Sequence, residues 1–306
     1  MTTVLAPLDY YTLIKVTGSD AQAFLQNQLS NDIKLVTETQ SQLSSYSSAK
    51  GMMFANLRIF MREGNYYLRL ASDTAEQVCK RLRMFVLRDD VQLTVAEDLT
   101  ILGLAGPDSL SALEQAKLTA PTGTDEVSNN DTQVIRCLSA TGEDRFELIS
   151  HPALQETLSE FSANSEAYLA KQLRSGEAFI SQATYEQFVA QNLNLELING
   201  VNFKKGCYPG QEYIARTQYR GQVRSRTYLL SANADMPAGT ALVTPNKEGE
   251  DSIGTIINSA KDGEQTIALA VVRNKSIEKQ AFALLGQPDV VLNQIALPYS
   301  LAPEDA

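Results

Sequence analysis

One short stretch of the chain, residues 204–212, gathers side chains that could do chemistry. Its sequence KKGCYPGQE places a thiol, two ammonium groups and a carboxylate close together. Positive charge beside Cys207 would favour its nucleophilic thiolate if the lysines point at it. Gly206 and Gly210 permit backbone angles that other residues avoid, and Pro209 fixes φ between them. We therefore expect a shaped turn that carries a candidate thiol; the alternative is a small core cysteine with solvated lysines.

Helices and strands must position this stretch, and their periodicity predicts a mixed α and β pattern. We expect a hairpin whose turn is Glu63-Gly64-Asn65, between strands over residues 57–60 and 66–71. We expect a helix after it, with Cys79 on its core face. After Arg226 the helical periodicity ends and short strands recur between prolines and glycines, a pattern typical of a small barrel.

The motif KGCYxGQE, followed by YIAR and YRG, resembles the signature of the YgfZ family. Other matching pieces stand in the expected order along the whole chain: LDYYTLIKVTGSDAQAFLQNQLSNDI, SAKGMMFANLRIF, INGVNFKKGCYPGQE and LPYSL. YgfZ proteins are folate-binding relatives of the glycine-cleavage T-protein, an aminomethyltransferase, and are related to tRNA modification. The resemblance implies an α+β fold in which two interleaved ferredoxin-like units form a folate-binding body, plus a small C-terminal β-barrel. We place the body in residues 1–222 and the barrel in residues 223–306.

The resemblance also implies site residues around the motif. Lys205, Cys207, Gln211 and Glu212 would face one cleft, with Arg220 as a further candidate for folate binding. Lys205 would hold an anionic carboxylate or lower the thiol pKa, and Glu212 would fix a neighbouring cation by a charge-assisted hydrogen bond. We take Cys207, Lys205 and Glu212 as candidate catalytic residues.

Two tyrosines stand where the family has aromatic residues that line the folate pocket. A pterin ring is flat, so an aromatic side chain is a natural stacking partner. The chain has no tryptophan, and the matching positions are Tyr11 and Tyr168. The alternative for each is an ordinary residue at the edge of the core.

The chain departs from the T-protein pattern at positions that matter for aminomethyl transfer. T-proteins carry a GGxxDDL segment, and the similar segment here is GMMFANL, with Ala55 and Asn56 in place of the two aspartates. Neither side chain accepts a proton at neutral pH, which disfavours aminomethyltransferase activity. Asn56 would instead bond a ligand or serve as a turn or strand-edge residue.

A second departure concerns a segment that is LEAG-like in T-protein relatives, in which the glutamate can pair with the amide edge of a pterin. Arg174 stands in that place, and a cation cannot accept the N–H donors of a pterin. Three alternatives stay open: Glu177 substitutes, the pterin binds differently, or folate binds weakly. Arg174 would then attract the glutamate tail of folate, or be a solvated arginine at a helix end.

Composition limits the partners. The 306 residues carry a net charge of −10, which disfavours direct nucleic-acid binding over a broad face but leaves a local basic patch open. Basic residues gather in residues 80–88 and 204–226, and the alternative for both is a solvated face. No apolar run of about 18 residues is present, so we expect no membrane span.

Cysteine and histidine usage argues against a metal site. Cys79, Cys137 and Cys207 are widely spaced, which is typical of a reducing cytoplasm and not of a disulfide framework. We expect Cys79 and Cys137 to be structural, and the one histidine, His151, to have a capping or surface role. A single cysteine cannot hold an iron–sulfur cluster, which needs about four ligands.

Three functions follow. The first is a cytoplasmic folate-binding protein, using tetrahydrofolate, that supports tRNA modification by maintaining iron–sulfur enzymes that thiolate tRNA. The second is a folate-dependent aminomethyltransferase-like enzyme. The third is a non-catalytic RNA-interaction factor that uses the basic stretch. The sequence assigns no chemical step.

Overall fold

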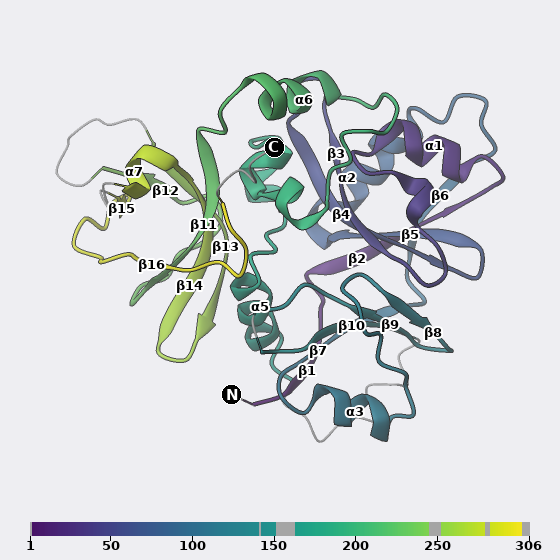
Figure 1. Cartoon of the computed structure of the whole chain (residues 1–306), viewed down its shortest axis with the longest axis horizontal. Coiled ribbons are helices and arrows are strands. Elements are labelled where there is room, and N and C mark those ends of the chain that lie inside the picture. Colours follow the sequence, from purple (N-terminus) through teal and green to yellow (C-terminus); the bar gives the residue numbers. More distant parts are fainter. Residues whose placement is uncertain (1, 141, 151–162, 245–251, 279–281, 302–306) are drawn as a thin grey trace.

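The computed structural model describes the chain except for residues 1, 141, 151–162, 245–251, 279–281 and 302–306, so His151 lies outside the described residues. The strands form three antiparallel sheets, which lie side by side with α5 between two of them (Figure 1). Cys79 and Cys137 are buried, as predicted. Among the described residues, no helix is both long and apolar enough to cross a membrane, and no cluster of His, Cys, Asp and Glu could hold a metal ion.

The first sheet has the strand order β3-β4-β5-β2-β6 and is covered by two helices. Its elements are β2 (Tyr11–Thr17), α1 (Ala21–Gln28), β3 (Gln42–Ser47), β4 (Met53–Arg62), β5 (Asn65–Ala71), α2 (Ser72–Arg83) and β6 (Gln92–Ala96). Phe24 of α1 and Val78 of α2 pack with the sheet in one buried cluster. The predicted hairpin turn is confirmed, since Glu63 and Gly64 both have positive φ between β4 and β5.

The second sheet has the order β1-β7-β10-β9-β8. Its elements are β1 (Val4–Pro7), β7 (Thr100–Ala105), α3 (Ser109–Gln115), β8 (Val127–Asn129), β9 (Gln133–Arg136) and β10 (Arg145–Ser150). The edge strand β1 comes from the N-terminus, and the chain then crosses to build the first sheet before it returns as β7. This crossing confirms the predicted interleaving of two α+β units.

The third sheet is curled and has the order β15-β12-β13-β14-β11-β16 (Figure 1). Its elements are β11 (Ser225–Ala232), β12 (Ala241–Val243), β13 (Gly254–Asp262), β14 (Gln265–Arg273), α7 (Asn274–Glu278), β15 (Ala283–Leu284) and β16 (Asn293–Ile295). Among the described residues its end strands, β15 and β16, do not pair with each other, so the expected barrel is seen as a curled sheet. The domain boundary near residue 222 stays a prediction.

Helices and single turns connect the second sheet to the third. They are α5 (Ser165–Arg174), the turns η2 (Gln182–Thr184), η3 (Ala190–Leu193) and η4 (Leu195–Ile198), and α6 (Gln211–Arg220); a further turn, η1 (Ile33–Leu35), follows α1. The helix α5 contacts both β1 and β13, so it joins two sheets. The segment after it lies between β4 and β13: the Asn258 side chain bonds both backbone polar groups of Phe179.

A buried charge cluster links the first two sheets at the centre of the molecule. Glu177, just after α5, is ion-paired to Arg145 of β10, to Arg69 of β5 at 2.9 Å and to Arg58 of β4 at 3.5 Å. A second carboxylate, Glu147 of β10, lies 3.2 Å from Arg69. Burial would raise the pKa of Glu177, but Arg145, Arg58 and Arg69 outweigh burial and hold that pKa well below its usual range.

We expect Glu177→Gln to destabilise the fold by about 3–5 kcal/mol at neutral pH, because it leaves buried arginines without their anion. The folded-state pKa lies below the unfolded value of about 4.3, so the carboxylate stabilises the protein above that pH. Its contribution is lost as the pH falls, and the difference between variant and wild type should shrink in acid. Urea unfolding followed by circular dichroism measures both effects.

The matched control is Asp235→Asn, which breaks the exposed pair between Asp235 and Lys261. It should leave the urea midpoint unchanged. Equal midpoints for Glu177→Gln and the wild type would contradict the central role of the cluster.

Candidate functional site

A lysine within the signature loop, residues 204–210, anchors this loop to a segment that is distant in the sequence. The Lys205 ammonium donates hydrogen bonds to the carbonyls of Gln26, Leu29 and Asn31 at 2.6, 2.5 and 3.1 Å. These carbonyls lie at and beyond the C-terminal end of α1, where backbone acceptors lack helical partners and the helix dipole favours a cation. Burial lowers the pKa of Lys205 to about 8, against the opposing charge of Asp32. The ammonium is therefore engaged by backbone carbonyls, and its expected place in a ligand cleft stays a prediction.

Two asparagines hold the loop's approach. The Asn202 side chain accepts from the backbone N–H groups of Lys204 and Lys205 at 2.8 and 3.1 Å. The Asn31 side chain donates to the carbonyl of Asn199 at 2.7 Å, and the backbone N–H of Asn202 donates to the carbonyl of Ser30. The motif pieces LSNDI and INGVNFKKG thus bind each other directly.

A third motif piece packs against the end of the loop. Gly210 has φ of +84°, and a Cβ there would lie 2.6 Å from the carbonyl oxygen of Ser48 and 2.7 Å from Cα of Gly51. Only glycine fits both the angle and the space. The turn of residues 48–51 therefore fixes where α6 begins.

The candidate thiol lies on the open side of this loop. Cys207 is exposed, and nothing lies within 4 Å of a Cβ built on the neighbouring Gly206. Gln211 donates weakly to the carbonyl of Lys205 at 3.5 Å, and Glu212 is exposed in the first turn of α6. Arg220 ends α6, and its side chain lies outside what the structure describes. The loop presents sulfur to solvent and does not seal it in the core.

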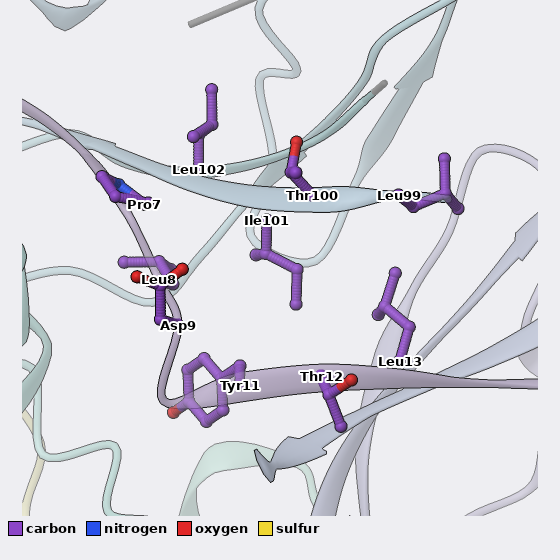
Figure 2. Close-up of a pocket in the computed structure, with 10 residues that line it drawn as sticks. All are labelled: Pro7, Leu8, Asp9, Tyr11, Thr12, Leu13, Leu99, Thr100, Ile101 and Leu102. Carbon is purple, nitrogen blue, oxygen red and sulfur yellow. The ribbon is translucent and has the colours of Figure 1, made fainter. Parts of the chain in front are cut away.

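Tyr11 lines a pocket elsewhere, which we call the Tyr11 pocket. The pocket has a volume of about 180 Å³ and lies between the start of β2 and β7, where Leu13 and Ile101 point into the space between the strands (Figure 2). Its lining residues are Pro7, Leu8, Asp9, Tyr11, Thr12, Leu13, Leu99, Thr100, Ile101 and Leu102. The Tyr11 hydroxyl accepts from Gln172 at 2.6 Å, and the Arg69 guanidinium lies 4.0 Å from the ring centroid. No residue of 204–212 lines this pocket, so the common cleft expected for Lys205, Cys207, Gln211 and Glu212 stays a prediction.

Tyr168, the second aromatic candidate, is fully buried by protein. A Cβ on Gly103 would lie 2.5 Å from its ring, so the tyrosine occupies the room that the glycine leaves. Its hydroxyl donates to the carbonyl of Phe146 at 3.1 Å and accepts from Arg145 at 3.2 Å. In this conformation the ring packs in the core and offers no free face to a ligand.

The two remaining candidates also have structural partners. The Asn56 amide donates to the carbonyl of Ala178 and accepts from the N–H of Ile180, both at 2.8 Å, so it pairs with backbone like a neighbouring strand. Arg174 forms an ion pair with Asp262 at the tip of β13, which ties α5 to the third sheet. Neither is free for folate as the chain stands here.

Sequence reasoning missed the partners of Lys205 and the arginines around Glu177. The resemblance points to Glu177 only as a substitute for the family glutamate that Arg174 replaces. A signal was present, since Arg58 and Arg69 lie inside the mostly apolar strands β4 and β5, and the short strand β10 contains both Arg145 and Glu147. Charges inside buried strands indicate ionic partners.

We expect Lys205→Met to lower the free energy of unfolding by about 1–3 kcal/mol, because three buried carbonyls lose their donor. The control is the same substitution at the exposed neighbouring residue, Lys204→Met, which should leave the free energy of unfolding unchanged. Urea unfolding measures both. Unchanged stability in Lys205→Met would show that the ammonium does not anchor the loop.

We expect one thiol for each native chain to react rapidly with a chromogenic disulfide reagent, and all three in denaturant. Cys207 is exposed, while Cys79 and Cys137 are buried, and burial raises the pKa of Cys137 to about 12. The fast phase should vanish in Cys207→Ser. A fast phase that persists in this variant would contradict the structure.

Comparisons with known proteins agree with this architecture. The family model described as the GCVT N-terminal domain matches residues 5–160. A tRNA-modifying protein YgfZ from Photorhabdus laumondii is 32% identical over 98% of this chain and 93% of its own length. Its namesake from Klebsiella pneumoniae is 28% identical over 99% of this chain and 94% of its own length.

A solved structure shows the same fold. The aminomethyltransferase T of the glycine cleavage system from Bartonella henselae superposes with a TM-score of 0.75 at 19% identity, covering 97% of this chain and 86% of that one. Sequence and fold agree over nearly the whole length. The chain therefore belongs to the YgfZ family of GCVT-fold proteins.

Proposed function

We propose that this protein is a cytoplasmic folate-binding factor that acts in tRNA modification by maintaining the iron–sulfur enzymes that thiolate tRNA. The observation that carries the proposal is the signature loop, which docks on two other family motifs and presents Cys207 to solvent. Nearly full-length similarity to proteins named for tRNA modification supports it. A thiol in this position is accessible to a second macromolecule.

Aminomethyl transfer is not supported. Ala55 is fully buried and both amide atoms of Asn56 are bonded to backbone, so neither position of the T-protein carboxylates offers a proton acceptor. We expect no glycine-cleavage activity from this chain.

The fit to folate is partial. Beside Tyr11, the buried amide oxygen Oε1 of Gln172 has no hydrogen-bond partner within the described part of the chain, and such an acceptor suits the N–H donors of a pterin. The Tyr11 pocket, at about 180 Å³, is smaller than the roughly 300 Å³ at which drug-sized ligand pockets begin. A whole folate does not fit the Tyr11 pocket at this volume, so binding there requires this pocket to widen, and we derive no chemical step through folate.

The chain does not itself supply a cluster site. Cys79 and Cys137 are buried, which leaves Cys207 as the exposed sulfur ligand. A role in iron–sulfur maintenance would therefore be exerted on partner enzymes.

We expect loss of the gene to lower thiolated nucleosides in tRNA, measured by mass spectrometry of digested tRNA. Cys207→Ser should fail to restore them while binding tetrahydrofolate as the wild type does in calorimetric titration, because the loop and the Tyr11 pocket share no residue. Tyr11→Leu should weaken tetrahydrofolate binding. A wild type that binds no folate, or a deletion without effect on tRNA, would overturn the corresponding part of the proposal.

A further inference from the structure

The helix α6, next to the signature loop, carries an unusual exposed face. It is the green helix at the top of Figure 1 and lies on the outside of the molecule. Its buried residue, Ile214, faces inward, whereas Tyr213 and Tyr219 are 43% and 69% exposed. Arg216 lies between these tyrosines, three residues from each, so the three side chains form one continuous row.

Contacts between neighbouring side chains hold this row in place. The Arg216 guanidinium lies 5.5 Å from the ring centroid of Tyr213, and Tyr219 meets Phe203 edge to face at 6.0 Å. Phe203 directly precedes Lys204, so the row continues into the signature loop. On the other side, Tyr213 packs against Gly51, beside the exposed Lys50. Two aromatic rings about 9 Å apart along the helix axis are thus held in place and open to solvent.

Charge around the row is positive and not neutralised. Residues 204–226 contain six cations and one acid, Glu212, although the whole chain has a net charge of −10. Lys50, Lys204, Arg216 and Arg224 are exposed, and none of them forms an ion pair within the part of the chain that the structure describes. Arg226 is paired with Glu196 and Lys205 is buried, so the charge that this face offers comes from the four exposed cations. Unpaired positive charge gathered on one face of an acidic protein indicates an anionic partner for that face.

Aromatic rings interleaved with free cations match the chemistry of unpaired nucleotides. Bases stack on exposed aromatic side chains, and lysine and arginine hold the phosphates. In a duplex the bases are stacked on each other, so a duplex would leave the tyrosines unused. An acidic protein segment would satisfy the cations through its carboxylates, whereas each unpaired nucleotide brings both an anionic phosphate and a flat ring, which matches the alternation of cations and tyrosines on this face.

We propose that the exposed face of α6, with Lys50 and Lys204 beside it, binds unpaired nucleotides of tRNA next to Cys207. This inference rests on the proposed function, which it deepens by naming the surface and the RNA class. The acidic total charge confines binding to this local patch, in agreement with the expectation that broad nucleic-acid binding is disfavoured.

The test is fluorescence anisotropy with labelled, unmodified tRNA, a single-stranded oligoribonucleotide and a blunt RNA duplex. We expect the full-length wild type to bind the first two more tightly than the duplex. The double variant Tyr213→Ala/Tyr219→Ala should bind about 30-fold more weakly, whereas Tyr213→Phe/Tyr219→Phe keeps the rings and should bind as the wild type does. The triple variant Lys50→Gln/Lys204→Gln/Arg216→Gln should lower the slope of log affinity against log salt by about 2.

Matched controls come from the other basic window. Phe85 is 44% exposed, like Tyr213, and Arg88 is exposed, so Phe85→Ala and Arg88→Gln remove the same kinds of group elsewhere. Both should leave RNA binding unchanged. No binding by the wild type, equal binding to the duplex, or equal losses in the controls would overturn the inference.

Nucleoside analysis in cells separates this inference from the proposed function. If gene loss lowers thiolated nucleosides but the tyrosine double variant restores them fully and the wild type binds no RNA, the RNA surface is wrong and the proposed function stands. If the double variant fails in cells although the wild type binds no RNA, the face binds a protein and this inference is overturned. If the wild type binds tRNA through α6 and gene loss leaves thiolation unchanged, the RNA surface stands and the proposed function fails.

Discussion

One buried carboxylate, Glu177, holds the centre of the molecule together. It follows α5 and is shared by arginines from β4 and β5 of the first sheet and β10 of the second. Charges taken out of water are costly unless each is paired, so loss of this carboxylate would leave the three buried arginines short of an anion. The cluster thereby adds an ionic constraint to the interface of the first two sheets, which also share a buried apolar cluster with Phe60 and Tyr67 from the first sheet and Ile101 and Ile149 from the second.

This constraint explains where the functional regions are. The centre is filled by ion pairs and by the Tyr168 ring, so the described hollow lies to one side, between β2 and β7. The signature loop cannot reach the hollow because Lys205 and Gly210 fix it to α1 and to the turn of residues 48–51. The Tyr11 pocket and the exposed thiol thus lie in separate places.

Local features could be predicted from the sequence, and long-range polar partners could not. The hairpin at Glu63-Gly64 and the buried face of Cys79 depend on neighbouring residues, whose periodicity is visible in the chain. Lys205 donates a hydrogen bond to the carbonyl of Leu29, which lies 176 positions away in the sequence, and no local pattern indicates that partner. From the sequence alone, a lysine close to a cysteine is equally compatible with activation of the thiol. The resemblance located the fold and the motif pieces, but it could not show that Asn56 and Tyr168 already have partners within the protein.

The anchoring of the signature loop also bears on what Cys207 can do. A thiol on a flexible loop would lose entropy each time it met a partner, whereas this loop is fixed by three carbonyls, two asparagines and a glycine contact before any partner arrives. The motif's lysine, asparagine and glycine positions are thus explained by the geometry they impose, and its cysteine is left without a structural duty. Cys207 is thus held in one exposed place by the other residues of the motif, which is what the proposed action on a second macromolecule requires.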